Sequence, residues 1–113
     1  MSGSQRTKGA AGEREVCHII RDILGVECRR NLFQTREGGS DIHLPPYWIE
    51  VKRRKAIGNL YDWMAQAEKA CGAGERPLVV VRADGKPWLA IMPLDDCLPL
   101  IREELRPDLP PPQ

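Results

Sequence analysis

The chain has 113 residues, which is the size of one small domain with a single core. Its composition is 42% hydrophobic and 29% charged, and no apolar run approaches the roughly 18 residues of a membrane span, so we expect a globular protein without a membrane role. The net charge of +1 argues against a protein that simply coats DNA, and residues 1–15 lack the apolar segment of a signal peptide, so we expect an intracellular protein.

The first predicted element is a helix from about Gly9 to Leu24, after a flexible N-terminus at residues 1–8. Its apolar residues recur at spacings of three and four, which is the period of one helix face. Glu13 falls on or near this apolar face, whereas Glu15 falls toward solvent. Two interpretations of Glu13 stay open: it serves the positive end of the helix, or it points into a functional site.

A short strand at about 26–31 and a polar loop at 32–40 come next, followed by two strands at 41–44 and 47–53. If the turn between them is centred on Pro45 and Pro46, residues whose numbers sum to 91 face each other, and Asp41 lies opposite Glu50. Directly opposed side chains have Cβ atoms about 4.5–5.5 Å apart, so two carboxylates there destabilise the sheet unless a cation lies between them.

The rest of the chain predicts a helix from 58 or 59 to 71, strands at 77–82 and 88–92, and a helix at 94–105 bent near Pro99. Leu60, Trp63 and Met64 are interpreted as core residues of the second helix. The sequence therefore predicts an α/β (α+β) domain over residues 9–106, with a central mixed sheet of about five strands flanked by helices, and a proline-rich tail at 107–113.

The predicted hairpin carries a pattern that suits metal chemistry. Because side chains alternate along a strand, Glu50 and Lys52 share one face. Mg²⁺ is commonly held by one or two carboxylates, with water and substrate phosphate completing its shell. Lys52 could orient the attacking water or neutralise charge on the phosphorus.

These motifs resemble the PD-(D/E)XK nuclease superfamily, and among its members archaeal-type Holliday junction resolvases and small phage-encoded relatives. The matching residues are the KGxxxER pattern that contains Glu13, then Ser40-Asp41, then Glu50-Val51-Lys52, with Ser40 in place of the family's proline. The resemblance implies a restriction-endonuclease-like core. It also implies a Mg²⁺ site, which Mn²⁺ could occupy, formed by Asp41, Glu50, the Val51 carbonyl and, as a further ligand, Glu13. Gln66 matches a glutamine of the following helix and joins the catalytic set.

Positive charge is concentrated near this hairpin: residues 1–60 hold 11 Lys and Arg against 7 Asp and Glu, whereas residues 61–113 hold 6 against 9. The residues that we expect to contact DNA are Lys8, Arg36, Arg53, Arg54 and Lys55. A solvated strand edge or flexible loop is the alternative for these charges, and a structural role on the opposite face is equally compatible for Arg53. His43 shares the face of Asp41, near a scissile phosphate or simply packed at a strand end.

The function predicted is a Mg²⁺-dependent DNA endonuclease, structure-selective in the manner of a junction resolvase and acting as a homodimer. Nucleases of flap, nicked or duplex DNA would use the same residues. A non-catalytic DNA-binding or assembly protein with a nuclease-like core is the alternative from another class, although uncompensated carboxylates would repel phosphate. The four cysteines form no CxxC pair and no zinc spacing with either histidine, which favours small buried thiols in a reducing compartment.

Overall fold

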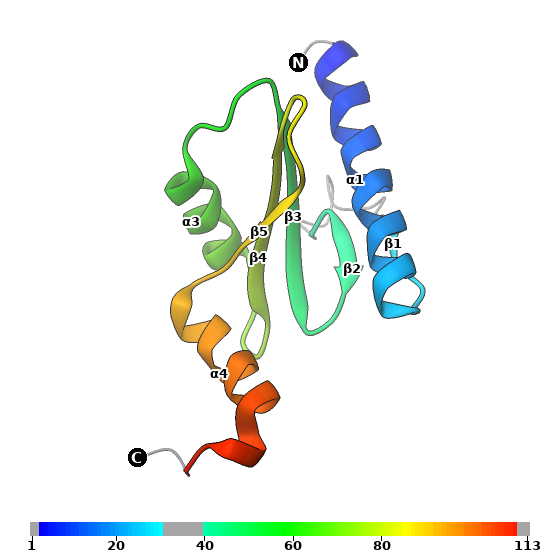
Figure 1. Cartoon of the computed structure of the whole chain (residues 1–113). Coiled ribbons are helices and arrows are strands. Elements are labelled where there is room, and N and C mark those ends of the chain that lie inside the picture. Colours follow the sequence, from blue (N-terminus) through cyan, green and yellow to red (C-terminus); the bar gives the residue numbers. More distant parts are fainter. Residues whose placement is uncertain (1–2, 31–39, 111–113) are drawn as a thin grey trace.

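The computed structural model describes residues 3–30 and 40–110, with only the backbone for residues 3–8 (Figure 1). Within these residues the chain forms three helices and five strands. In order they are α1 (Gly3–Leu24), β1 (Arg29–Arg30), β2 (Ile42–Leu44), β3 (Tyr47–Arg54), α3 (Leu60–Ala70), β4 (Arg76–Ala83), β5 (Leu89–Ile91) and α4 (Leu94–Leu105), followed by the 3₁₀ turn η1 (Arg106–Asp108).

The strands form one mixed sheet in the order β1-β2-β3-β4-β5. Strands β3 and β4 pair in parallel over eight residues each, and every other neighbouring pair is antiparallel. The parallel pair needs a crossover, which α3 supplies. This is the predicted α+β architecture, a five-stranded mixed sheet with helices on both faces, and it is consistent with a restriction-endonuclease-like core.

Helices α1 and α3 cover opposite faces of the sheet because the side chains of β3 and β4 alternate (Figure 1). On the first face, Val16 and Cys17 of α1 pack against Ile42, Ile49 and Val51. On the second face, Met64 and Ala67 of α3 pack against Val79 and Val81. The sheet therefore separates two apolar clusters, and β3 contributes side chains to both sides.

The element boundaries differ from the predictions mainly at the N-terminus. Helix α1 begins at Gly3, whereas the sequence predicted a start near Gly9 after a flexible segment. The apolar pattern marks only the turns that pack on the sheet, and the polar residues before them continue the helix because none is a strong helix breaker. Strand β1 is reduced to two residues of the predicted 26–31.

Helix α4 spans the predicted residues and has Pro99 inside it, but none of its residues is buried. In Figure 1 it continues away from the lower end of the sheet, beyond the layer that α1 and α3 form with the strands. None of the helices within residues 3–30 and 40–110 has the length and apolar character needed to cross a bilayer.

The cysteines are all free thiols, and two of the four are buried as predicted. Cys17 and Cys28 lie in the core under α1 with their sulfur atoms 3.5 Å apart, whereas Cys71 and Cys97 are partly exposed. The interpretation of all four as buried residues was therefore wrong for Cys71 and Cys97, which lie at the end of α3 and within α4, where the packing is incomplete.

Candidate active site

The hairpin of β2 and β3 has the predicted register. Ile42 pairs with Ile49, and Leu44 pairs with Tyr47, so the paired numbers sum to 91. Asp41 follows the last paired residue, and its backbone N–H donates to the carbonyl of Ile49 at 2.9 Å, one position out of this register. The regular pairing therefore ends at Ile42, and the predicted closeness of Asp41 and Glu50 is seen in the interaction of their carboxyl groups and not in a ladder pair.

The Asp41 carboxylate lies at the end of β2 and is tied to β3. Its Oδ2 accepts a hydrogen bond of 2.7 Å from the backbone N–H of Val51. Burial raises the pKa of Asp41 to about 6, and the charge of Glu50 together with a hydrogen bond between the two carboxyl groups adds to that rise, although Val51 N–H and Lys52 act in the other direction. A raised pKa means that the isolated site disfavours two negative charges, which is the condition that a bound cation relieves.

Two tryptophans surround the Glu50 and Lys52 side chains. Trp48 Nε1 donates a hydrogen bond of 2.7 Å to Glu50 Oε1. The Lys52 ammonium lies 6.0 Å from the centroid of the Trp63 ring, and the Arg54 guanidinium lies 5.6 Å from the same centroid. These contacts hold both charged side chains against aromatic rings.

Sequence reasoning missed the roles of these tryptophans. Trp63 was interpreted as core, and it does pack against the α3 cluster, but the same ring contacts Lys52 and Arg54. The signal for Trp48 was present in the chain, because Trp48, Glu50 and Lys52 alternate on one face of a strand. An amphipathic indole with a polar N–H often finds a partner when it is half-buried.

The Val51 backbone is directed toward the Asp41 carboxylate. Within a strand the N–H and C=O groups of one residue point to the same neighbour, and the Val51 N–H is directed at Asp41. The Val51 carbonyl is therefore directed at the β2 side of β3, next to the Asp41 carboxylate. This orientation suits the predicted backbone ligand.

Glu13 reaches the sheet from α1 and is buried, with 8% of its surface exposed. Its Oε1 accepts a hydrogen bond of 2.8 Å from Arg30 Nε, an ion pair that sequence reasoning did not foresee. Within residues 9–30 and 40–110, no group of three or more His, Cys, Asp and Glu side chains is arranged to hold a metal. The structure therefore brings together Asp41 and Glu50, and it does not add Glu13 to them as a third ligand.

Gln66 lies on α3, the helix that covers the same sheet face as Lys52, and its side chain is exposed. The neighbouring Ala67 is the residue that α3 buries at this level. Gln66 is thus on the correct side of the sheet for the predicted role, but it does not pack into the pair of carboxylates.

Four of the five predicted DNA-binding residues fall into two groups. Arg54 and Lys55 are exposed at the end of β3, on the side where Arg54 stacks on Trp63. Arg36 lies outside the described residues, as does the side chain of Lys8. His43 is exposed and pairs with Trp48, on the face of Glu50.

Arg53 points to the opposite face and is engaged there. Its Nη1 lies 3.0 Å from Glu15 Oε2, and Arg82 of β4 binds the other Glu15 oxygen. The prediction that Glu15 points to solvent was wrong: the turn of α1 that packs over β3 brings it between two arginines, with Trp88 Nε1 at 3.4 Å. Of the two roles predicted for Arg53, this ion pair favours the structural one.

The pair of carboxylates fits a small divalent cation by its chemistry. It offers hard oxygen donors on two adjoining strands, a carbonyl beside them and a raised Asp41 pKa that a positive ion would reverse. Two protein carboxylates are enough for Mg²⁺ when water and substrate phosphate complete the shell.

A comparison with protein families gives one match: a family described as "Phage putative PDDEXK endonuclease" matches residues 4–107. The chain belongs to this phage PDDEXK endonuclease family. The match extends over nearly the whole described chain and includes Asp41, Glu50 and Lys52. The predicted superfamily and the likeness to small phage relatives are therefore confirmed.

Membership in the phage PDDEXK family identifies the chain, at a coarse level, as a nuclease-type hydrolase whose substrate is DNA. No curated protein and no solved structure matches it. The resemblance to junction resolvases stays a prediction, because the family description does not name a DNA structure.

Proposed function

We propose that the protein is a divalent-metal-dependent DNA endonuclease whose active site is centred on Asp41, Glu50 and Lys52. The observation that carries this proposal is the cross-strand pair of Asp41 and Glu50, in which burial and like charge raise the pKa of Asp41 to about 6. Two neighbouring carboxylates destabilise a sheet, and a function that requires both of them would explain why they are present. The family match supports the same reaction class.

Asp41, Glu50 and the Val51 carbonyl would hold Mg²⁺, with Mn²⁺ as a substitute. Glu13 is the further ligand that the resemblance implies, and its ion pair with Arg30 would have to open for direct coordination. When bound, such an ion lowers the pKa of a coordinated water and neutralises charge that develops on the phosphate.

The protein's own groups would then orient the reactants. Lys52, held over the Trp63 ring, would hydrogen-bond the attacking water or a phosphate oxygen. Trp48 fixes one Glu50 oxygen and the Val51 N–H fixes one Asp41 oxygen, so both carboxylates keep their direction during the reaction. Gln66, exposed on α3, would contact DNA or Lys52 only after a change of its rotamer.

The substrate that we propose is branched DNA, with the four-way junction first. The resemblance to junction resolvases supports recognition of DNA shape over sequence. Flap, nicked and linear duplex DNA are the alternatives within the same chemistry.

A cleavage panel tests both activity and substrate. Wild type and Asp41→Asn are incubated with junction, flap, nicked, linear and single-stranded DNA in Mg²⁺ or EDTA. We expect Mg²⁺-dependent cutting by the wild type, strongest on the junction, and a loss of at least 10³-fold in Asp41→Asn. Undiminished Mg²⁺-dependent cutting by Asp41→Asn would overturn the assignment.

Lys52→Ala measures the contribution of the ammonium separately. We expect cleavage to fall by about 10²–10⁴-fold while DNA affinity in EDTA stays within a factor of two or three. If the wild-type protein bound junction DNA but cut none of the substrates, the alternative of a non-catalytic DNA-binding protein would be favoured instead.

We further propose that the enzyme is a homodimer in which α4 docks on a second copy. The stripe of Leu94, Leu98, Ile101 and Leu105 runs along α4 at helical spacing, and each of these side chains is 43–67% exposed. Beside the base of α4 lies an apolar groove of about 440 Å³ between α1 and the sheet, lined by residues such as Ile20, Leu24 and Trp88.

A second copy of the chain is the occupant that fits both features. An exposed apolar stripe and an apolar groove on one chain are complementary to each other, and a two-fold axis satisfies both at once. The radius of gyration is 15.2 Å, above the about 13 Å of a compact chain of this size, because α4 projects from the sheet. Exposed apolar side chains on α1, β5 and α4, such as Ile23, Leu89 and Leu94, would be covered by such an interface.

The oligomeric state tests this surface directly. We expect a dimer by sedimentation velocity for the wild type and a monomer for Leu98→Glu/Ile101→Glu. Tyr61→Glu, at a side chain on α3 that is 92% exposed, serves as the matched control and should remain a dimer. A monomeric wild type at concentrations where it cuts DNA would contradict the proposal.

A further inference from the structure

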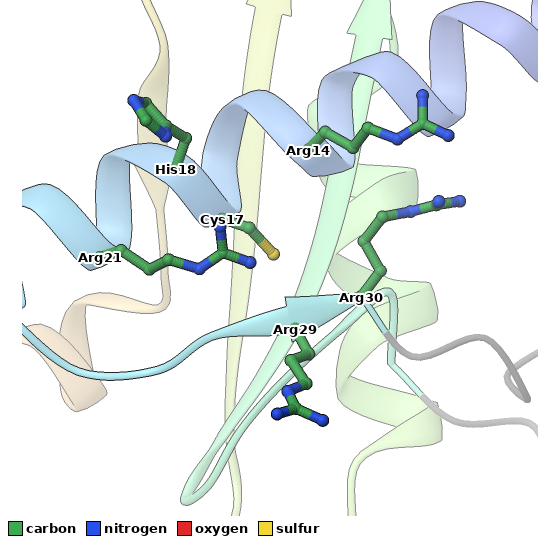
Figure 2. Close-up of a pocket in the computed structure, with 6 residues that line it drawn as sticks. All are labelled: Arg14, Cys17, His18, Arg21, Arg29 and Arg30. Atoms are coloured by element: carbon green, nitrogen blue, oxygen red, sulfur yellow. The ribbon is translucent and has the colours of Figure 1, made fainter.

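A basic pocket lies between α1 and β1, outside the pair of Asp41 and Glu50. It has a volume of about 530 Å³ and is shown in Figure 2. We call it the arginine pocket. Its lining residues come from three turns of α1 and from the edge strand: Arg14, Cys17, His18, Arg21, Arg29 and Arg30.

Two of the arginines are fixed by contacts with the protein. Arg21 donates from Nε and Nη2 to the Cys28 carbonyl, at 3.2 and 2.8 Å. Arg30 donates from Nε to Glu13 at 2.8 Å. A guanidinium has five N–H donors, so each of these residues keeps donors for a ligand while its position is already set. Fixed donors reduce the entropy that a ligand must remove on binding.

Arg14 differs from both, since it is exposed and has no ion pair or hydrogen bond with any residue in the described part of the chain. Figure 2 shows its side chain leaving α1 in the same direction as Arg30 leaves β1. An arginine without a carboxylate partner, held beside a second arginine, is a site of uncompensated positive charge.

Among the described residues, no carboxylate lines the arginine pocket. Three acids lie near its rim, and each has a partner there: Glu13 with Arg30 at 2.8 Å, Asp22 with His18 at 3.3 Å, and Glu27 with Arg29 at 3.4 Å. Burial raises the pKa of the Cys17 thiol to about 12, so this residue stays neutral at physiological pH and adds no negative charge. The pocket therefore suits an anion with several oxygen atoms.

We propose that the arginine pocket binds a backbone phosphate of the DNA substrate, at a position separate from the scissile phosphate. This inference rests on the proposed nuclease function. Planar guanidinium groups match phosphate oxygens, and arginine is the residue commonly used where such oxygens are bound by two hydrogen bonds.

The position of the pocket relative to Asp41 supports a contact with the same DNA molecule. Arg30 pairs with Ile42, which is the neighbour of Asp41 along the chain. The Arg30 side chain and Ile42 share the α1 face, whereas Asp41 points to the α3 face, so the DNA strand would pass around the edge of the sheet formed by β1 and β2. Adjacent strands lie about 4.8 Å apart, and one DNA strand rises about 3.4 Å per nucleotide, so that path covers only a few nucleotides. The pocket would thus hold the strand beside the cut and fix its register.

Salt-dependent binding of Arg14→Gln tests the proposal. Junction DNA is titrated with full-length protein in EDTA, so that no cleavage occurs, between 50 and 300 mM salt. One lost phosphate contact reduces the slope of log K against log salt by about 0.9, which is roughly an eightfold loss of affinity at 0.1 M salt. Arg14→Lys keeps the point charge and should recover most of that loss.

Arg106→Gln is the matched control, because it removes one exposed arginine at the far end of the chain, next to α4. It should leave affinity and slope within experimental error of wild type. In Mg²⁺, Arg14→Gln should raise the KM for DNA while kcat at saturating DNA changes little, since the pocket lies away from the reacting atoms.

Wild-type affinity and slope in Arg14→Gln would overturn the inference, and so would an equal loss in Arg106→Gln, which would indicate a general charge effect. If inorganic phosphate alone protected the wild type, but not Arg14→Gln, against thermal unfolding while DNA affinity was the same in both, the pocket would be a small-anion site and the DNA proposal would be wrong. These results are independent of the Asp41→Asn assay, so either proposal can fail without the other.

Discussion

The two faces of β3 carry charge in opposite ways. On the α1 face, Arg53 and Arg82 bind one carboxylate, Glu15, and the charges compensate each other. On the α3 face, Glu50 lies near Asp41, and burial together with this like charge raises the pKa of Asp41. The cluster around Glu15 therefore stabilises the packing of α1 on the sheet, whereas the carboxylates of Asp41 and Glu50 repel each other. The like charge of Glu50, added to burial, distinguishes the candidate site from the structural cluster here.

The largest expected effect is on the α3 face, where removal of one carboxylate should lower the cleavage activity and raise the stability. Glu50→Gln should reduce Mg²⁺-dependent cleavage by at least 10³-fold, since a metal ligand is lost, and should raise the metal-free unfolding free energy by about 1 kcal/mol, since the repulsion is lost. Cleavage assays and denaturation in EDTA measure the two quantities. A variant that lost activity and stability together would show that Glu50 is held mainly for packing.

Glu15→Gln should show the inverse behaviour on the α1 face. Removing the carboxylate leaves Arg53 and Arg82 without their shared partner, and Arg53 Nε is already buried with no hydrogen-bond partner among the described residues. We expect the unfolding free energy to fall by about 2 kcal/mol, with Mg²⁺-dependent cleavage retained at temperatures well below the Tm. Loss of cleavage in a folded Glu15→Gln protein would remove the distinction between the two faces.

The pH dependence of stability provides a third comparison. The folded pKa of Asp41, about 6, lies above its unfolded value near 3.9, so the native protein binds more protons between these values. In metal-free buffer the contribution of Asp41 to the unfolding free energy should decrease as pH rises from about 4 to about 6 and then level off. The difference in unfolding free energy between wild type and Asp41→Asn, measured by denaturation at several pH values, isolates the contribution of Asp41. An unchanging difference across that window would show that the Asp41 pKa is not raised.

The smallest effects are expected at two glycines of α1. A Cβ at Gly12 would lie 3.2 Å from Arg53 Cβ and 3.3 Å from the Trp88 ring, whereas one at Gly9 would meet nothing within 4 Å. Gly9→Ala should stabilise the protein by about 0.5–1 kcal/mol through helix propensity, and Gly12→Ala should destabilise it by about 1 kcal/mol because α1 would have to move off β3. Thermal denaturation of the two variants distinguishes them. Equal effects would mean that α1 does not approach β3 closely at Gly12.

Much of the fold followed from periodicity, and the hairpin register followed from the turn. The spacing of apolar residues located α3, α4, the strands β2 to β5 and the end of α1 to within a few residues, because packing on one face imposes that period. The closeness of Asp41 and Glu50 could be predicted because two prolines leave few ways to centre the turn, and the register from Ile42 to Leu44 then follows.

Contacts between elements distant in sequence could not be predicted in the same way. Glu13 with Arg30 and Glu15 with Arg53 depend on how α1 is rotated about its axis, and an error of one residue turns a side chain by 100°. The tryptophan contacts with Glu50 and Lys52 depend on rotamers that no local pattern specifies. The arginine pocket likewise depends on how α1 packs beside β1. In the sequence alone, its arginines therefore look like separate solvent-exposed charges.

The positions of the three tryptophans give the protein an internal optical probe. Trp48 is hydrogen-bonded to Glu50 and Trp63 lies under Lys52, while Trp88 belongs to the α1 face beside Glu15. A cation held by Glu50 would change the electric field at the Trp48 indole and leave Trp88 unaffected. The emission of Trp48, recorded in a protein whose other two indoles are replaced by phenylalanine, would therefore report occupancy of the carboxylate pair without any DNA present.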